Sequence, residues 1–517
     1  MKRAELIHQL EQQERWDMII IGGGATGLGA AVEAASRGYR TLLLEGHDFA
    51  SGTSSRSTKL IHGGVRYLQQ GNIALVLDAL HERGLLIRNA PHLVQNRSFI
   101  VPLYDWWEGP FYGVGLKLYD ALAGKLGLGP SQLLSRAETL EQLPTLAEKG
   151  LRGGVIYHDG QFDDARLAIA LARTAVEHGA TVINHLPVTA LIKESGQVFG
   201  VVAHDAASGR EFELAAKVVI NATGPFCDSI RRLDDPAAPA LLAPSQGIHL
   251  VLPRAFLPGA SAIMVPHTDD GRVLFAVPWH DRVLLGTTDT PVDSVDFEPL
   301  PLAAEIDFLL QHAARYLRQN PQREDILSIF AGLRPLVKSG DSQETASLSR
   351  DHTLLVTPSG LVTITGGKWT TYRKMGEDTI TLAARIAVLP ERPSRSAELP
   401  LHGAGAGAEV PGEWAGYGSD AAGLEALCLS DPSLRKLLHP DLPYRRAEIV
   451  WGIRHEWAYS VEDLLSRRTR ALILDARAAI AVAPAVAALL ATELDKDATW
   501  QAAQIAAFTT LAQGYLP

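Results

Sequence analysis

The chain alternates short apolar runs with polar and glycine-rich stretches, and this pattern is clearest in its first fifty residues. Residues 18–21 are wholly apolar, which is typical of a strand buried on both faces of a sheet. An alanine-rich stretch then leads to Gly38, a residue suited to a helix C-cap, and a second strand is predicted at 40–44. We therefore predict a strand, a glycine turn, a helix and a second strand, with Glu45 at its end.

The turn between the first strand and the helix has G-x-G-x-x-G spacing at Gly22, Gly24 and Gly27. In a dinucleotide-binding unit the first glycine permits a tight turn, the second lets the backbone approach the pyrophosphate, and the third lets helix and strand pack closely. Glu45, twenty-three positions after Gly22, is placed to accept hydrogen bonds from a ribose diol. An acid at this position disfavours the 2′-phosphate of NADP, so the spacing predicts NAD or FAD.

Three later features favour FAD. After Glu45, "GHDFASGTSSRSTKLIHGG" is a long polar segment without helical period, suited to a cofactor that lies extended along a loop. Further on, "AAKVVINATGP" predicts a strand ending in A-T-G, and "LVTITGGKWTTYRKMGEDTITLAARIA" predicts a strand, a Gly-Gly turn and a helix. Together these resemble the two-domain FAD oxidoreductases of the D-amino-acid oxidase type, where the N-terminus of the last helix stabilises reduced flavin.

This resemblance implies that FAD contacts the fingerprint, the polar segment, the A-T-G strand end and the Gly-Gly turn. The residues expected at the cofactor are Gly22, Gly24, Gly27, Glu45, Thr53, Ser54, Ser55, Lys59, His62, Gly63, Gly64, Ala222, Thr223, Gly224, Gly366, Gly367, Lys368 and Thr370.

Bulk composition limits the possible partners. The 517 residues are 46% hydrophobic and 21% charged with a formal net charge of −10, as in a soluble globular protein without a field that attracts nucleic acid. An anionic substrate would therefore need a local basic pocket. Two cysteines are too few for a disulfide framework or a Cys-based metal site, and we expect no metal. We expect no signal peptide and no spanning helix; the alanine-rich run 478–491 is expected to be a packed helix.

A narrower resemblance rests on eight motifs spread in order along the chain. They are "TSSRSTKLIHGGVRYL", "DDARL", "NATGP", "GIHLVLP", "LLGTTDT", "FAGLRPL", "SRDH" and "GGKWTTYRK". These resemble the FAD-dependent, quinone-linked sn-glycerol-3-phosphate dehydrogenases over roughly residues 16–380. The resemblance implies oxidation of sn-glycerol 3-phosphate to dihydroxyacetone phosphate, with electrons passing through FAD to ubiquinone. It also implies a cytoplasmic protein bound peripherally to the inner face of the cytoplasmic membrane.

The resemblance further implies a set of residues near the flavin, because a small phosphate dianion needs several guanidinium or ammonium groups. We expect Arg334 and Arg350 to hold the phosphate, His249 to act as the base, and Lys368 to orient the hydroxyl and stabilise anionic flavin. The catalytic residues are thus expected to be His249, Lys368 and Arg334, and those at the substrate to be Arg66, Tyr67, Arg334, Arg350 and Lys368.

Other interpretations of these residues stay open. His249 lies in an apolar run and could be a core histidine, and Arg334, before Pro335, could merely cap a strand end. "DDARL" could be a helix start with Asp163 or Asp164 as N-cap. Gln246 stands where relatives often carry lysine, so one cation near the site is missing.

We expect an α/β fold with three parts. A discontinuous Rossmann-type FAD-binding domain is expected at about 16–75, 150–225 and 345–387, with an α+β substrate domain at about 76–149 and 226–344. A Pro- and Gly-rich linker at 388–425 should lead to a helical C-terminal domain at 426–517. The aromatic stretch 101–135 predicts either a surface that dips into lipid headgroups or packing within the substrate domain.

Three alternatives to the dehydrogenase remain. One is a glycerol-3-phosphate oxidase that passes electrons to O₂ with the same motifs. Another is an amine or amino-acid oxidoreductase of the same fold, which would need one carboxylate clamp rather than several cations. The third is a flavin-binding protein without turnover. For the assembly, we keep a homodimer as an option.

Overall fold

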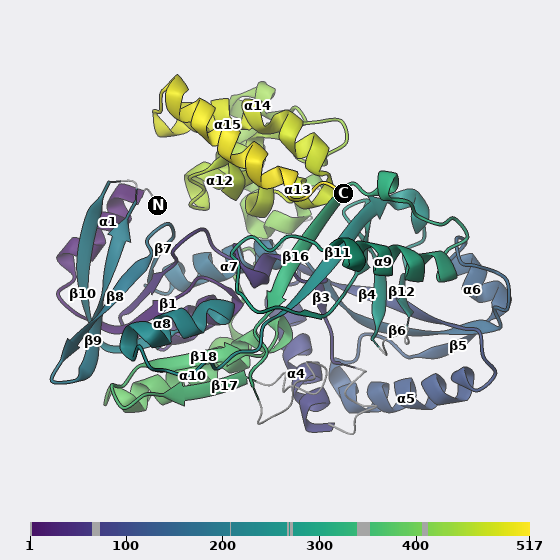
Figure 1. Ribbon diagram of the computed structural model, residues 1–517, viewed down its shortest axis with the longest axis horizontal. Coiled ribbons are helices and arrows are strands. Elements are labelled where there is room, and N and C mark those ends of the chain that lie inside the picture. The colour runs from purple at the N-terminus through teal and green to yellow at the C-terminus, as the bar shows by residue number, and fades with distance from the viewer. Residues whose placement is uncertain are drawn as a thin grey trace.

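Two sheets and a group of C-terminal helices make up the protein (Figure 1). The structure is a computed structural model that describes residues 3–64, 73–206, 208–265, 268, 272–338, 352–405 and 412–517. The helices α12 to α15 lie at the top of Figure 1, above the junction of the two sheets.

The first sheet carries the glycine fingerprint. Its strands run in the order β17-β18-β10-β1-β2-β7, with β9 pairing to β10 and β8 to β9. Pairing among β7, β2, β1, β10 and β18 is parallel. The strands are β1 (Trp16–Ile21), β2 (Thr41–Leu44), β7 (Thr181–Ile183), β8 (Val188–Glu194), β9 (Gln197–Asp205), β10 (Arg210–Asn221), β17 (His352–Val356) and β18 (Val362–Gly366).

Both faces of β1 are covered, which explains its unbroken apolar run. Successive residues of a strand point to opposite faces. Met18 and Ile20 therefore pack in a core with the helices of one face, whereas Ile19 and Ile21 pack in another core on the other face. The helices of the first face are α2 (Ala25–Ser36), α7 (Asp164–Glu177) and α10 (Tyr372–Ile386); the second face has α1 (Arg3–Gln12) and α8 (Cys227–Asp234).

The second sheet runs β15-β11-β14-β13-β12-β4-β6-β3, with β16 pairing to β11 and β5 to β6. Its pairings are antiparallel except for β12 with β4. The strands are β3 (Leu60–Ile61), β4 (Val94–Leu103), β5 (Gln132–Ser135), β6 (Gly153–Phe162), β11 (Ser245–Pro253), β12 (Ala262–Val265), β13 (Leu274–Trp279), β14 (Arg282–Gly286), β15 (Thr290–Pro291) and β16 (Ser328–Arg334). Its helices are α4 (Ile73–Asn89), α5 (Glu108–Ala123), α6 (Arg136–Gln142) and α9 (Ala303–Tyr316).

The C-terminal helices pack on the second sheet through a shared core that includes Phe330 of β16 and Leu284 of β14. The helices in this core are α12 (Arg446–His455), α13 (Ala471–Leu474), α14 (Ala476–Leu494) and α15 (Ala498–Gln513), whereas α11 (Ala421–Ser430) packs against α12 in a separate core. Among the described helices, α14 alone is long and apolar enough to cross a membrane. One face of α14 lies in this core with α15, which agrees with the packed helix expected at 478–491.

The expected α/β class with a helical C-terminal part is confirmed. Two segments differ from the expected domain map. The strands β3 and β6 were expected in the FAD-binding domain, but they lie in the second sheet, because β3 pairs with β6 and β6 in turn pairs with β4. The expected linker also contains ordered structure, since α11 begins at Ala421 and Leu401 is buried in the core of the first sheet.

Candidate active site

The glycine turn after β1 forms a cradle that only glycine fits. Gly22 has φ +110°, and a Cβ there would lie 2.6 Å from the carbonyl oxygen of Ala222. A Cβ on Gly27 would lie 1.9 Å from the carbonyl oxygen of Gly22, so this glycine lets α2 approach the turn. Gly22 and Gly24 line a large cavity, whereas Gly27 does not line it.

Glu45 at the end of β2 organises the same turn. Its carboxylate accepts hydrogen bonds from the backbone N–H of Gly23 at 2.6 Å and of His47 at 2.8 Å. Burial raises the pKa of Glu45 despite these two donors. The side chain lines the cavity, as the ribose-binding acid of a dinucleotide site should.

The cavity has a volume of about 760 Å³ and extends from the fingerprint to the second sheet. This is enough room for a large cofactor together with a small substrate. Residues from four predicted segments line the cavity: the fingerprint, the polar segment after Glu45, the A-T-G strand end and the Gly-Gly turn. The opposite end is lined by apolar side chains of the second sheet, namely Phe99, Tyr157, Met264 and Phe275. The residues present therefore fit FAD.

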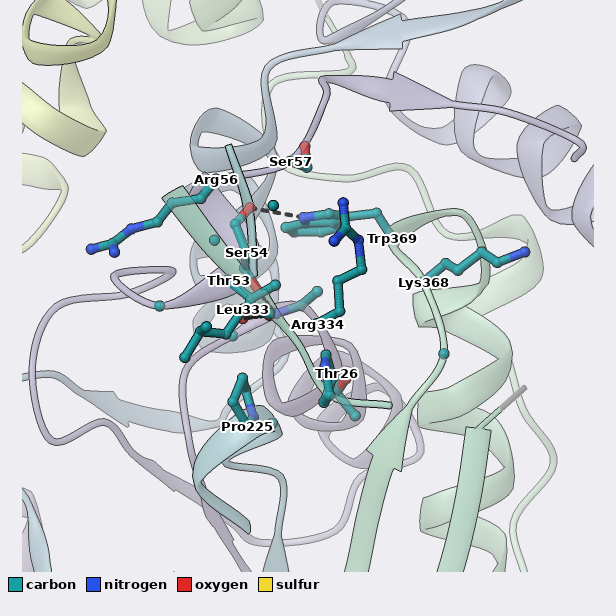
Figure 2. A pocket seen from close by; sticks show the side chains of 18 of the residues that line it. Thr26, Thr53, Ser54, Arg56, Ser57, Pro225, Leu333, Arg334, Lys368 and Trp369 are labelled. Carbon is teal, nitrogen blue, oxygen red and sulfur yellow. Dashed lines mark hydrogen bonds between the residues drawn. The ribbon is translucent and has the colours of Figure 1, made fainter. Parts of the chain in front are cut away.

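The Gly-Gly turn is joined directly to the polar segment. Gly366 and Gly367 have φ +79° and +70°, and a short 3₁₀ turn at Trp369–Thr371 precedes α10. The indole Nε1 of Trp369 donates to the carbonyl oxygen of Ser54 at 2.8 Å, a bond drawn in Figure 2. The helix thus begins a few residues later than expected, at Tyr372.

His249 on β11 lies in the cavity wall and is only 3% exposed. Its Nε2 is 2.9 Å from the hydroxyl of Thr58, and its ring stacks on Phe330 with centroids 4.8 Å apart. Burial, Lys59 and Arg334 hold the pKa of His249 well below its usual range, so the ring is neutral at physiological pH. Among the described residues, no hydrogen-bond partner meets its Nδ1.

Four cationic side chains line the cavity among the described residues: Arg56, Arg272, Arg334 and Lys368. The guanidinium of Arg334 donates to the Asp289 carboxylate at 3.2 Å and to the carbonyl oxygen of Thr288 at 2.8 Å. In Figure 2, Arg334 lies between Arg56 and Lys368, whose side chains extend to opposite sides. The Arg56 and Lys368 side chains are directed away from each other in this view, and Arg66 and Arg350 of the predicted cationic set lie outside the described residues.

Most residues expected at the cofactor line the cavity, but four do not: Gly27, Ser55, Lys59 and Gly63. The Lys59 ammonium is fully buried and donates to the Asp164 carboxylate and to the carbonyl oxygen of Ser55, both at 2.6 Å. A Cβ on Gly63 would meet Leu80 and Tyr119 at 2.4 Å, so this residue faces α4 and α5. The predicted residues Arg66, Tyr67 and Arg350 lie outside the described residues.

Several cavity residues were not predicted. Arg56 and Thr58 belong to the polar segment that was expected along the cofactor, but nothing in the sequence distinguished these two residues from their neighbours. Arg272 and Asp159 lie in stretches without a recognisable motif, and only the folded chain brings them to the cavity.

Two open interpretations are resolved by hydrogen bonds. Asp163 caps α7, because its carboxylate accepts from the N–H groups of Ala165 and Arg166 at 3.1 Å. Gln246 donates to the Glu305 carboxylate at 2.8 Å and does not line the cavity. Gln246 is therefore a buried structural amide of the second sheet.

Comparison with known proteins agrees with this geometry. The family of FAD dependent oxidoreductases matches residues 17–373, and the C-terminal domain of alpha-glycerophosphate oxidase matches residues 414–501. The mitochondrial glycerol-3-phosphate dehydrogenase of Homo sapiens is 41% identical over 531 residues, covering 96% of this chain and 73% of its own. That of Arabidopsis thaliana is 40% identical, covering 94% of this chain and 84% of its own.

Solved structures show the same relationship. The glycerol-3-phosphate dehydrogenase from Bacillus halodurans, solved with FAD, superposes with a TM-score of 0.81 at 29% identity, over 100% of this chain and 98% of its own. Glycine oxidase from Geobacillus kaustophilus shares the fold alone, with a TM-score of 0.54 at 23% identity. The chain therefore belongs to the FAD-dependent oxidoreductases, in the family of the glycerol-3-phosphate dehydrogenases.

Proposed function

We propose that this protein oxidises sn-glycerol 3-phosphate to dihydroxyacetone phosphate with FAD as cofactor and a membrane quinone as final acceptor. The observation that carries the proposal is the single cavity that joins a dinucleotide cradle to a wall bearing a neutral histidine and several cations. The similarity to glycerol-3-phosphate dehydrogenases over nearly the whole chain supports the choice of substrate.

The fingerprint turn and Glu45 would hold the adenosine half of FAD, and the segment 51–64 with the Gly-Gly turn would hold the flavin half. When bound, FAD supplies the acceptor for the hydride that leaves C2 of the substrate. Gly366 and Gly367 let the chain pass close to the ring, since both adopt positive φ. Lys368, next in the chain, brings a positive charge to the cavity beside them.

His249 is the proposed acceptor of the C2 hydroxyl proton. A base must be unprotonated before the reaction, and burial with two neighbouring cations keeps this ring neutral. We place proton acceptance at Nε2, because Thr58, which is bonded to this nitrogen, itself lines the cavity. The Thr58 hydroxyl would give its own proton to Nε2 and at the same time accept the proton of the substrate hydroxyl, so that Thr58 stays neutral.

Arg334 and Arg350 are the proposed ligands of the substrate phosphate. The Arg334 guanidinium is held in place by Asp289 and by the carbonyl oxygen of Thr288, so it enters binding with little rotamer freedom to lose. Its charge is shared with Asp289, and a phosphate dianion would therefore need further cations. Arg56 and Arg272 are the additional candidates in the cavity wall.

Anaerobic mixing with glycerol 3-phosphate tests the substrate. The flavin absorbance near its visible maximum should bleach, and an unbleached spectrum would refute the assignment. Stopped-flow reoxidation then tests the acceptor. Reoxidation by a short-chain ubiquinone should be faster than by O₂, and reaction with O₂ at the turnover rate would favour the oxidase.

We also propose that α5 rests on the membrane that holds the quinone. One side of α5 is buried through Tyr112, Leu116 and Tyr119, whereas another group of apolar side chains is open to solvent. The exposed group comprises Phe111, Val114 and Leu118 of α5 with Trp106 and Trp107 just before it, and Trp106 is 77% and Val114 73% exposed. Aromatic side chains of this kind are favoured at the lipid headgroup level. Burial of one side supports the expected packing within the substrate domain, and the exposed side supports the proposed contact with lipid headgroups.

Flotation with anionic phospholipid vesicles tests this surface. Replacing Trp106 and Phe111 with serine should reduce the bound fraction several-fold. Leu429→Ser is the matched control, because Leu429 is 74% exposed but lies in α11 of the C-terminal part. Equal binding of the double variant and the wild type would exclude α5 as the contact. Attachment at the inner, cytoplasmic face and a homodimer stay expectations from the sequence.

A further inference from the structure

The C-terminal helices reach the cofactor-binding half of the protein through three buried arginines. Arg467, Arg468 and Arg470 lie in the segment 466–470, and each is at most 3% exposed. A buried guanidinium is costly unless it is paired with a carboxylate. Each of the three meets an acid from the first 164 residues of the chain.

Arg467 and Arg468 both bind Asp48, in the loop after β2. Arg468 makes two bonds of 2.7 Å to the two carboxylate oxygens, and Arg467 donates through Nε at 2.5 Å. The same loop lines the cavity at His47 and Ala50. The N–H of Ala50 donates to the carbonyl oxygen of Gly23 at 2.9 Å, so the loop is tied to the fingerprint turn.

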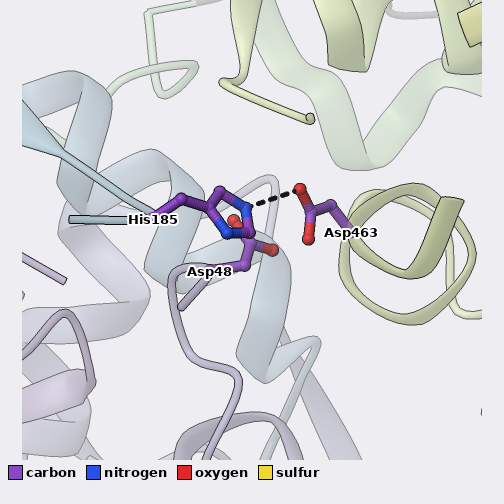
Figure 3. Close-up of side chains that lie close together, drawn as sticks. All are labelled: Asp48, His185 and Asp463. Carbon is purple, nitrogen blue, oxygen red and sulfur yellow. Dashed lines mark hydrogen bonds and ion pairs between the residues drawn. The ribbon is translucent and has the colours of Figure 1, made fainter. Parts of the chain in front are cut away.

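Asp48 also belongs to a group of possible metal ligands with His185 and Asp463 (Figure 3). Their ligand atoms lie within 4.8 Å of one another. However, arginine donors occupy both oxygens of Asp48, and Asp463 binds His185 at 2.9 Å and Arg467 at 3.0 Å. The group is therefore an ion-pair network that joins the C-terminal helices to this loop.

Arg470 contacts the part of the polar segment nearest to the reacting groups. Its Nη2 donates to the carbonyl oxygen of Ser55 at 2.7 Å and to Oδ1 of Asp164 at 3.1 Å. The ammonium of Lys59 binds the same two residues from the other end of the turn, at 2.6 Å each. The turn 55–59 is thus closed by two cations that share the Ser55 carbonyl oxygen and the Asp164 carboxylate: Lys59, at the end of the turn, and Arg470, from the C-terminal part.

This clamp holds a turn that is strained. Lys59 has φ +63°, which is unfavourable for a residue with a Cβ and persists only where the surroundings impose it. Ser57 adds two bonds to Oδ2 of Asp164, the oxygen that Lys59 also binds, at 3.1 Å from its N–H and 2.7 Å from its hydroxyl. Thr58 lies between Ser57 and Lys59, and its hydroxyl meets Nε2 of His249.

We propose that Arg470 is a positioning residue for substrate oxidation, which acts by clamping the turn that presents Thr58 to His249. The C-terminal helices thereby complete the active site, although Arg470 itself does not line the cavity. This inference rests on the proposed function. A second contact of Arg470 supports a fixed geometry, because its guanidinium carbon lies 5.8 Å from the centre of the ring of Trp279, at the end of β13.

Arg470→Met tests the clamp in the FAD-loaded protein, with Arg166→Met as the matched control. Arg166 makes a bidentate bond to Glu456 of the C-terminal part, at 2.8 Å, with the Arg166 side chain 13% exposed, and its guanidinium donates to Glu456 rather than to the turn 55–59. Both variants lose one ion pair between the two parts of the chain. Only Arg470→Met should release the turn.

Two readouts are expected to separate the variants. In hydrogen-exchange mass spectrometry, peptides covering 53–60 should exchange about tenfold faster in Arg470→Met and at the wild-type rate in Arg166→Met. At saturating glycerol 3-phosphate, anaerobic flavin reduction should slow about ten- to a hundredfold in Arg470→Met, because a displacement of about 1 Å near the chemistry can cost this much. The half-saturating substrate concentration should change less than about threefold, since the cations of the cavity remain.

Arg470→Lys keeps the charge but not the fork of donors, so it should recover part of the rate and part of the protection. Thr58→Val should slow reduction to a similar degree while the exchange of 53–60 stays near normal. If Arg470→Met reduces flavin no more slowly than Arg166→Met, the proposal is overturned. If Arg470→Met does not retain FAD, the other two variants decide the outcome. Wild-type rates of flavin reduction in both Arg470→Lys and Thr58→Val would then overturn the proposal. Failure of wild-type flavin to bleach would instead overturn the proposed function.

Discussion

Gly27→Ala would test how closely α2 must approach the glycine turn. The added Cβ would lie 1.9 Å from the carbonyl oxygen of Gly22 and 3.0 Å from its carbonyl carbon, whereas ordinary contact begins at 3.4 Å. Helix and turn would have to separate by about 1.5 Å, and both are backbone, so no side chain can rotate away. The turn itself is constrained, since Gly22 already adopts φ +110° against Ala222.

Two opposing effects decide the magnitude. Alanine stabilises a helix interior by about 0.5–1 kcal/mol relative to glycine, whereas overpacking typically costs about 1–3 kcal/mol. We expect a net loss of about 1–2 kcal/mol in stability, and a similar loss in FAD binding, which corresponds to about a tenfold weaker affinity. Thermal unfolding of the apoprotein and fluorescence titration with FAD measure the two quantities separately.

Gly115→Ala is the control with the opposite sign. Gly115 lies in α5, and a Cβ there meets nothing within 4 Å, so only the gain in helix propensity applies. Its unfolding temperature should rise slightly, and its FAD affinity should stay unchanged. If Gly27→Ala behaves like Gly115→Ala in both assays, the close approach of helix and turn does not limit cofactor binding.

Three further predictions follow from individual side chains. His249→Ala should lower kcat about a hundredfold or more with little change in KM, and a near-normal kcat would remove it as the base. Glu45→Gln should weaken FAD binding in titration, by about 1–3 kcal/mol, because the amide cannot accept from both backbone donors; unchanged affinity would contradict this. Burial lowers the pKa of His402, but Asp420 and Glu177 more than offset this and raise it to about 9. Since the raised value belongs to the folded state, this stabilisation is complete below about pH 6.5 and disappears as the pH rises through about 9. His402→Gln should therefore lower the unfolding temperature at pH 6 but hardly at pH 10, and an equal loss at both would contradict the ion pairs.

Local sequence predicted the first βαβ unit well, because short-range chemistry determines it. The spacing of Gly22, Gly24 and Gly27 reflects steric needs within a single turn, and the structure meets each of them. The apolar run of β1 predicted burial on both faces for a similar reason, since strand periodicity assigns its side chains to two cores. The A-T-G and Gly-Gly motifs could also be recognised, because each follows an apolar run that forms a buried strand. The two strands are parallel neighbours, so both motifs lie at the same edge of the sheet.

The side-chain partners of the polar segment were predicted less well. Lys59 was expected along the flavin, yet its ammonium is buried against Asp164, which lies 105 residues further along the chain. Gly63 likewise faces α4 and α5 instead of the cavity. A motif specifies which residues occur together in a loop, but the direction of each side chain depends on elements that pack against it later.

The sequence by itself determined the family, the cofactor and the position of the dinucleotide cradle, because these depend on glycine spacing, strand ends and motifs read within short windows. Only the tertiary structure decided which of the charged residues line the cavity and which are used in buried ion pairs. Arg470 and Asp164 are 306 residues apart, and no periodicity or spacing links them. Burial of an arginine must be compensated by whatever acid the fold brings to it, so such pairs exist only once the helices have packed on the sheets.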